Sequence, residues 1–354
     1  MPVSIARPVV KRDQQMLWIH AGPHKAASSY VTERLRKNRA ALASQGVLMD
    51  GDDNRLANAI AQKNYDPVEQ AMATLPEGLN RVLISSSSLD TRILKKSVLT
   101  TLRDRAAVHG FKLGVSYCIR DQQSWLNSVY CHRIRRFRET PDFPDYCDYI
   151  INDRDSWDIA YPSKFKAFKV FPEITTLFLP LSKRVAITDP FLALVDALDL
   201  DDPQGGQGWL KGEPSKQNIQ PGAKGIWMSR LCRNLVVELG VDPERLERKG
   251  KVIRDLAIEL GWDRDKFDGF DQPLLDHVAG FYQASNEAFA QEHWGVSWQE
   301  LFPQKPAAPS VYPGPLTDGD RVQMRRWMVR VIRELNLPWL LRRRFFRLYD
   351  AVVA

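Results

Sequence analysis

The sequence is poor in cysteine and contains no long hydrophobic run. Its 354 residues include four cysteines, and no two of them have the two-residue spacing of a zinc knuckle or a redox motif. No stretch approaches the roughly 20 apolar residues of a membrane-spanning helix, and the N-terminus lacks the apolar core of an export signal. We therefore expect a soluble, cytoplasmic protein with reduced thiols.

Most of the chain also lacks an excess of charge of either sign. The net charge of +7 comes from the last 34 residues, where nine arginines stand against two acids, and the rest balances 41 bases against 41 acids. A general polyanion-binding fold is therefore not expected, and no nucleic-acid-binding motif is present. With 44% hydrophobic and 26% charged residues, the chain has an ordinary globular composition and is long enough to bury a core.

Strand-like and helix-like patterns alternate in the first half of the chain. Apolar runs followed by helical patterns lie at residues 16–21, 82–84 and 113–119. The first of these helical patterns runs over 29–45, residues 183–188 predict one more strand, and 223–290 has a helical pattern. This order predicts an α/β fold in which helices flank a parallel sheet, with a helical C-terminal half and ligand groups beyond the carboxyl ends of the strands.

A proline-rich segment separates this region from the basic C-terminus. Residues 303–315 contain five prolines, which indicates a stiff, extended linker. We therefore divide the chain into an α/β domain over 1–302, a linker over 303–319 and a basic amphipathic helical tail over 320–354.

The tail combines an apolar stripe with arginines. The stripe consists of Met324, Trp327, Met328, Val331 and Leu335. Such a helix can dock on its own domain or on a second copy in a homodimer, lie on an anionic membrane surface, or capture an acidic polymer. A peripheral position at the inner membrane surface therefore accompanies the cytoplasmic prediction.

A candidate anion-binding loop lies between the first predicted strand and helix. It consists of Gly22, Pro23, His24, Lys25, Ala26, Ala27, Ser28 and Ser29. Backbone N–H groups and the helix dipole favour an anion at such a junction, Lys25 adds a positive charge, and Ser28 and Ser29 add hydroxyl donors. A serine N-cap beside a solvated lysine is the structural alternative. The loop lacks the G-x-x-x-x-G-K-[ST] pattern of triphosphate-hydrolysing enzymes.

Two segments resemble bacterial sulfotransferase-like proteins. Ile19–Tyr30, followed by Lys37–Val47, resembles the family's opening G-x-H-K-T-G-T-[TS] and the helix that ends in L-x-x-x-G-[VI]. Ile119–Tyr130 resembles its R-x-[QP]-x-x-[WR]-x-x-S-x-[YW] element, and Gln283–Phe289 is a looser match to a later segment. These segments are spread over most of residues 17–300.

The resemblance implies a sulfotransferase that uses 3′-phosphoadenosine 5′-phosphosulfate and releases 3′,5′-diphosphoadenosine. Lys25 and the backbone of 24–29, a P-loop-like loop with the Ser28 and Ser29 hydroxyls, would hold the 5′-phosphosulfate, and Arg120 and Ser128 the 3′-phosphate. The acceptor would be a hydroxyl or an amine of a carbohydrate, a lipid headgroup or a metabolite. No metal is implied. Taken alone, Arg120 could instead pair with a nearby carboxylate, and Ser128 could be a helix-surface serine.

Two departures from the family pattern concern the chemistry. Ala27 stands where relatives have glycine, and Ser87 stands where many relatives carry the glutamate of an S-S-E segment near the acceptor. Without that carboxylate, the candidate bases are His24, His132 and Asp90. A noncatalytic nucleotide-binding or scaffold protein of the same fold, and a P-loop kinase, therefore stay open as alternatives.

Overall fold

The structure is a computed structural model that describes ten stretches of the chain. These are residues 2–8, 10–51, 53–138, 141–152, 159–203, 208–212, 219–242, 244–247, 250–310 and 316–353. The chain forms two compact units, each built from separate stretches. The first contains Met1–Trp125, Asp155–Ser215 and Ala279–Lys305, and the second contains Leu126–Arg154, Lys216–Val278 and Pro306–Ala354. This interleaved grouping differs from the consecutive division at residue 302 that the sequence suggests.

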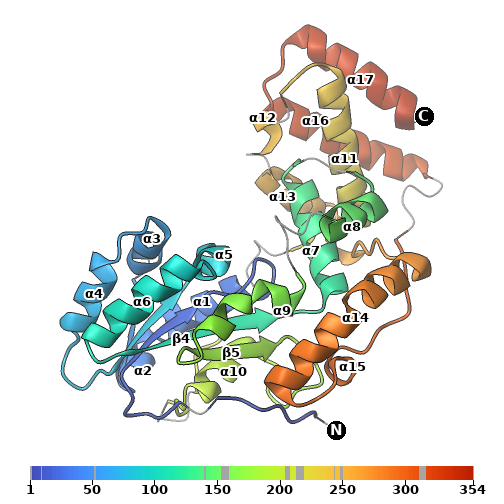
Figure 1. Ribbon diagram of the computed structural model, residues 1–354. Helices are drawn as coiled ribbons and strands as arrows, with labels where there is room; N and C mark the ends of the chain where they lie inside the picture. The colour runs from blue at the N-terminus through green and yellow to red at the C-terminus, as the bar shows by residue number, and fades with distance from the viewer. Residues whose placement is uncertain are drawn as a thin grey trace. The chain divides into compact units, whose positions relative to one another are not determined.

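A five-stranded parallel sheet lies at the centre of the first unit (Figure 1). The strands, in the spatial order β2-β3-β1-β4-β5, are β1 Met16–His20, β2 Val47–Met49, β3 Arg81–Ser85, β4 Lys112–Ile119 and β5 Thr175–Pro180. All neighbouring pairs are parallel. Because parallel strands require crossovers, helices separate them in the chain. The predicted parallel α/β fold is confirmed.

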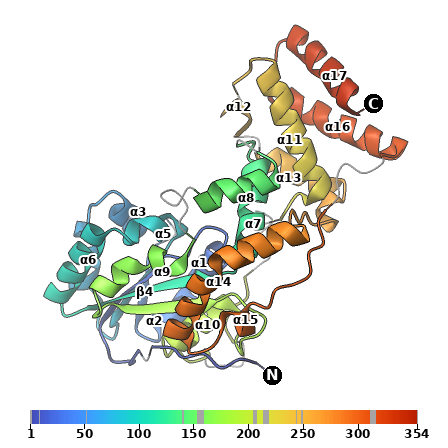
Figure 2. The ribbon, with the colours of Figure 1, turned by 45° about the vertical axis from the view of Figure 1, so that its right-hand side comes forward.

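Helices cover both faces of this sheet (Figure 2). The helices of the first unit are α1 Ser28–Lys37, α2 Arg39–Ala43, α3 Arg55–Ala61, α4 Asp66–Ala73, α5 Asp90–Ile93, α6 Lys96–Val108, α9 Tyr161–Lys164, α10 Pro190–Ala197 and α15 Trp298–Leu301. Short 3-10 helices lie at Ser87–Leu89 and Lys166–Val170. The side chains of β1 alternate between the two layers: Leu17 and Ile19 pack with α3, α4 and α6, whereas Met16 and Trp18 pack with α1, α2 and α10.

The second unit is helical and has a core of its own. It contains α8 Phe143–Asn152, α11 Gly222–Glu238, α12 Glu244–Glu247, α13 Gly250–Glu259, a 3-10 helix at Trp262–Arg264, α16 Asp318–Glu334 and α17 Trp339–Val353. Two helices, α7 Gln122–Arg135 and α14 Gln272–Trp294, begin in one unit and end in the other. The helical C-terminal half is therefore confirmed.

The predicted apolar stripe of the tail is buried in the core of the second unit. Met324, Trp327, Met328 and Val331 are all 0% exposed, and they pack with residues of α11 and α13. The stripe therefore docks on the chain's own fold. Of the predicted linker, residues 311–315 lie outside the described residues, and the N–H of Ser310 donates to the carbonyl of Asp268 at 2.7 Å.

Two local predictions are wrong. Residues 183–188 do not form a strand, because Val185 makes only an isolated bridge with Val3, and the N–H of Arg184 closes a turn on Ser182 Oγ at 3.0 Å. The fifth strand is instead β5, just before that turn. The helix predicted over 29–45 is interrupted at Asn38, which lies between α1 and α2.

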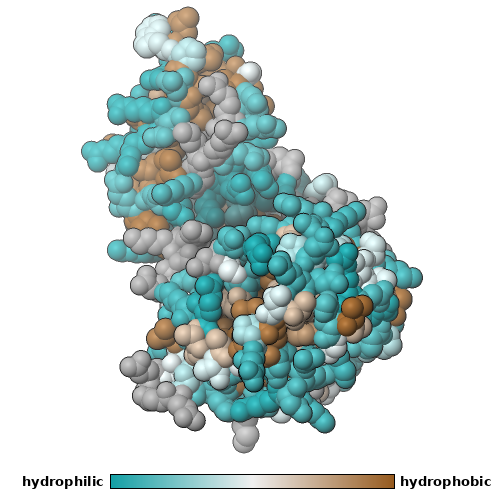
Figure 3. Space-filling model, turned by 90° about the vertical axis from the view of Figure 1, so that its left-hand side faces the viewer, coloured by the Kyte–Doolittle hydropathy of each residue, from teal (hydrophilic) through white to brown (hydrophobic). Residues whose placement is uncertain are grey.

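The surface and the thiols fit the composition. Hydrophilic residues cover most of the face shown in Figure 3, where apolar residues form separate patches. The four cysteines are buried and form no disulfide, and burial raises the pKa of the Cys118 thiol to about 12. Within the described ranges, no helix is both long and apolar enough to cross a membrane.

Candidate functional site

The loop between β1 and α1 has an unusual backbone. Lys25 and Ala27 both have positive φ, at 67° and 58°. The N–H of Ala26 and the hydroxyl of Ser28 both donate to the carbonyl of Pro23, at 3.1 and 3.0 Å, so the chain turns tightly before the helix. The Ser28 proton is thus used within the loop rather than offered to a ligand, whereas Ser29 is exposed.

Helix α1 begins without a capping side chain. Its N-cap residue is Ala27, which makes no side-chain hydrogen bond to the first-turn amides. In most helices a serine, threonine or aspartate side chain satisfies one of these donors. Amides that lack such a cap, together with the positive end of the helix dipole, suit the binding of an anion.

Gly22 is needed at the start of the loop because of close contacts. A Cβ at this position would lie 2.6 Å from Ser28 Oγ and 3.3 Å from the imidazole of His20. The first distance is shorter than any normal contact with a side-chain oxygen, so a larger residue would displace Ser28 from its bond to Pro23. A glycine at residue 22 therefore allows the loop to close onto the end of β1.

The segment after β4 contacts this loop directly. Arg120 Nη1 donates to the carbonyl of Lys25 at 3.0 Å, and Trp125 Nε1 donates to the carbonyl of His24 at 2.8 Å. The hydroxyl of Tyr161 donates to the carbonyl of Arg120 and fixes the backbone there. The structure therefore brings Lys25 and Arg120 together, as expected for residues that follow neighbouring parallel strands.

A buried amide pair joins the second and third segments of the resemblance. Gln122 Nε2 donates to Asn286 Oδ1 at 2.6 Å, and Asn286 Nδ2 donates back to Gln122 Oε1 at 2.9 Å. Both side chains are buried, at 3% and 5% exposure. Because a buried amide needs such partners, this pair fixes α14 against the start of α7.

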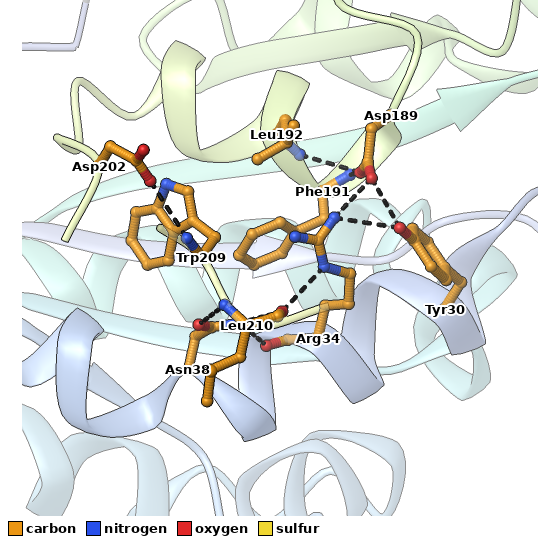
Figure 4. A network of polar contacts seen from close by, with 9 residues as sticks. All are labelled: Tyr30, Arg34, Asn38, Asp189, Phe191, Leu192, Asp202, Trp209 and Leu210. Carbon is orange, nitrogen blue, oxygen red and sulfur yellow. Dashed lines mark hydrogen bonds and ion pairs between the residues drawn. The ribbon is translucent and has the colours of Figure 1, made fainter. Parts of the chain in front are cut away.

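Helix α1 is held in place by a polar network around Arg34 (Figure 4). The guanidinium of Arg34, on a side chain 3% exposed, forms an ion pair with Asp189 and donates to the hydroxyl of Tyr30 at 3.0 Å. Asp189 also caps α10 by accepting from the amides of Phe191 and Leu192, at 2.9 and 3.2 Å. The network therefore fixes the helix that follows the loop relative to α10.

The candidate bases have different surroundings. His24 is exposed on the loop. Asp90 is in an ion pair with Lys164, whose Nζ lies 3.1 Å from Asp90 Oδ1. His132 lies on α7 in the second unit, and its Nδ1 lies 3.1 Å from Arg135 Nη2. Because a guanidinium can only donate, Nδ1 accepts there, and a neutral His132 carries its proton on Nε2.

Ser128 and the serines at the end of β3 lie in different units of the protein. Ser128 is half-buried on α7, within the second unit. At the end of β3, Ser87 begins a short 3-10 helix, and the hydroxyl of Ser86 accepts from the amide of Ser88 at 3.3 Å. Among the residues that the structure describes, no cluster of histidine, cysteine, aspartate and glutamate could hold a metal ion.

Sequence reasoning missed His20, the last residue of β1. It is 0% exposed, and burial lowers its pKa to about 4, so the imidazole is neutral at physiological pH. In the sequence it is one polar letter at the end of an apolar run. Its position directly before the Gly22 turn was the available signal.

Comparison with known proteins gives no match to a family model, to a curated protein or to a solved structure. The site is therefore interpreted from its own geometry and from the motifs of the sequence.

Proposed function

We propose that the first unit binds 3′-phosphoadenosine 5′-phosphosulfate and transfers its sulfuryl group to a hydroxyl or an amine. The proposal depends on one observation, the hydrogen bond from Arg120 to the carbonyl of Lys25. The two segments that the sequence assigns to opposite ends of an adenosine bisphosphate therefore lie side by side. This bond uses one of the five N–H donors of the Arg120 guanidinium.

The loop supports binding of the 5′ end in a P-loop-like manner. Two left-handed residues, Lys25 and Ala27, turn the backbone ahead of an α1 terminus that no side chain caps. Backbone amides arranged in this way form a concave anion site. The assignment of the 3′-phosphate to Ser128 as well as Arg120 depends on the sequence resemblance.

The proposed chemistry is a direct displacement at sulfur. The bond between sulfur and the bridging phosphate oxygen breaks, its electron pair remains on the phosphate, and a bond forms between sulfur and the acceptor oxygen or nitrogen. Lys25 would stabilise the charge that develops on the leaving phosphate. The acceptor proton would go to a base, for which His24 is the candidate within the first unit, whereas the candidacy of His132 depends on the sequence alone.

A noncatalytic nucleotide-binding protein is the second candidate. It is favoured by Ser87, which replaces the family's carboxylate at the end of β3, and by the ion pair that engages the nearby Asp90. A kinase is a third reading of the same loop, and it requires ATP with magnesium.

Titration calorimetry tests the proposal. We expect 3′,5′-diphosphoadenosine to bind without magnesium and ATP with magnesium not to compete. Lys25→Ala should weaken binding by roughly tenfold to a hundredfold, the usual value of a hydrogen bond to a charged group. Lys63→Ala is the matched control, because the exposed Lys63 has a similar φ of 60° outside the loop.

Three outcomes separate the candidates. Binding followed by transfer to an acceptor supports the sulfotransferase. Binding without turnover in a broad acceptor screen supports the noncatalytic protein, and a preference for ATP with magnesium supports the kinase. Equal losses of affinity in the two lysine variants would contradict the role given to Lys25.

For the C-terminus, we propose contact with an anionic membrane surface through α17 alone. Trp339 and Leu340 are 66% and 71% exposed, and Arg343, Arg344 and Arg347 are exposed on the same side of the helix. The opposite side is buried in the core of the second unit. Exposed aromatic and basic side chains together suit the headgroup region of anionic lipids. A homodimer contact through this surface is the alternative.

A further inference from the structure

Three neighbouring strands place polar side chains in one buried row beneath the loop. His20 of β1 is the register partner of Ser85 on β3 and of Ser116 on β4. The three side chains are 0–2% exposed. Partners in register point to the same face of a sheet, so the row lies on the face that α1 covers. Thr32 of α1 hydrogen bonds to Ser85, with 2.7 Å between the two hydroxyl oxygens.

The contacts of this row bear on the tautomer of His20. Trp18 Nε1 lies 3.0 Å from Ser116 Oγ, and an indole nitrogen can only donate. Ser116 Oγ therefore accepts from Trp18, and it lies 3.2 Å from His20 Nδ1. The hydroxyl carries one proton, and when Ser116 directs it to Nδ1, the proton of the neutral imidazole lies on Nε2.

Gly114 makes this arrangement possible. It is the register partner of Trp18 on β4, and a Cβ there would lie 2.1 Å from the indole ring. The indole can lie against the strand and reach Ser116 only because residue 114 has no side chain. Trp18, Gly114 and Ser116 thus work together to orient the ring of His20.

Among the residues that the structure describes, Nε2 of His20 has no hydrogen-bond partner. It faces the loop, because a Cβ placed on Gly22 would lie 3.3 Å from Nε2 and 2.6 Å from Ser28 Oγ. An unpaired buried donor is destabilising, and few occur in folded proteins. This donor lies next to an α1 terminus that also lacks a capping side chain.

We propose that His20 is an anion-binding residue whose Nε2–H donates to an oxygen of the phosphate held in the loop. The inference deepens the proposed function, since it concerns the 5′ end of the same nucleotide, and it requires only that the loop binds a phosphate. The imidazole acts as a neutral donor. It is oriented from behind by Ser116, so that no rearrangement is required when the anion arrives.

Nuclear magnetic resonance of the full chain tests this inference. In protein labelled with ¹⁵N at its six histidines, long-range correlations distinguish the two tautomers. His20→Gln identifies the His20 signal. We expect the Nε2–H tautomer without ligand, and a shift of the Nε2 resonance on saturation with pyrophosphate or with 3′,5′-diphosphoadenosine. His109, on the far side of the sheet with Glu69 3.3 Å away, should not shift.

Binding measurements supply the second arm. His20→Gln should weaken pyrophosphate binding by roughly tenfold, the effect of losing one hydrogen bond to a charged group. An Nδ1–H tautomer, or an Nε2 resonance that stays constant while a ligand saturates the loop, overturns the inference. If the nucleotide binds without a shift of the Nε2 resonance, the proposed function stands and the role of His20 fails. If pyrophosphate shifts the Nε2 resonance but the nucleotide does not bind, the role of His20 stands and the proposed function fails. If neither ligand binds, both fail.

Discussion

Replacement of Ala27 by glycine should stabilise the protein, although glycine normally destabilises. Ala27 has φ 58° and ψ 1°, in the left-handed region. An L-residue there costs roughly 1–2 kcal/mol, which glycine avoids. Glycine in turn loses about 0.4–1 kcal/mol through the greater freedom of the unfolded chain. Ala27→Gly should therefore raise the free energy of unfolding by about 0.5 kcal/mol.

The matched control is the same substitution inside a helix. Ala107 is exposed near the end of α6, in the same unit, and it has ordinary helical geometry. Ala107→Gly should lower the free energy of unfolding by about 1 kcal/mol. The two substitutions should therefore change the free energy of unfolding in opposite directions, and the two variants should differ from each other by about 1.5 kcal/mol.

Urea denaturation, followed by tryptophan fluorescence, measures both variants against the same transition. Titration with 3′,5′-diphosphoadenosine adds a functional readout, and Ala27→Gly should bind at least as tightly as the parent, because the loop loses a Cβ where relatives of the proposed family have none. If Ala27→Gly destabilises as much as Ala107→Gly, residue 27 is not left-handed in solution, and the account of the loop is wrong.

Three further predictions concern other parts of the chain. Arg34→Met should lower the free energy of unfolding by about 3 kcal/mol, because it leaves Asp189 without its buried partner; urea denaturation measures it, and a loss below about 1 kcal/mol contradicts it. The folded pKa of His20, about 4, lies below the unfolded value of 6.5. Between these two pH values the imidazole is protonated in the unfolded chain but not in the folded protein, so the free energy of unfolding falls as the pH is lowered from 6.5 to about 4. His20→Gln should reduce the loss of stability over this range by about 3 kcal/mol. Reversal of charge at residues 343, 344 and 347 should weaken binding to vesicles that contain phosphatidylglycerol by roughly a hundredfold or more.

The vesicle experiment has its own control. Arg92, Lys95 and Lys96 are exposed around the start of α6, and reversal of their charges changes the net charge by the same amount in the other unit. Binding that falls equally in both triple variants would reflect net charge rather than α17. A change of oligomeric state in the α17 variant, with no vesicle binding by the parent protein, would favour the homodimer contact.

The sequence by itself determined the class of the fold and the position of the loop. Strands β1, β3 and β4 are apolar runs followed by helical patterns, and such patterns are local properties of the chain. Gly22, Lys25 and Ser28 are recognisable because a strand, a turn and a helix follow one another within a few residues. The three-residue β2 and the strand β5, which ends at Pro180, carry too weak a local signal, and both were missed.

Only the tertiary structure decided which groups meet at the loop. The bonds from Arg120 to Lys25 and from Gln122 to Asn286 join residues 95 and 164 positions apart, and no local pattern encodes them. The burial of His20 and its contact with Ser116 arise only when β1 and β4 pair. The apolar stripe of α16 was compatible in sequence with a membrane, a partner or its own core, because amphipathicity shows that a face will be covered but not what covers it. Packing against α11 and α13 decided that question.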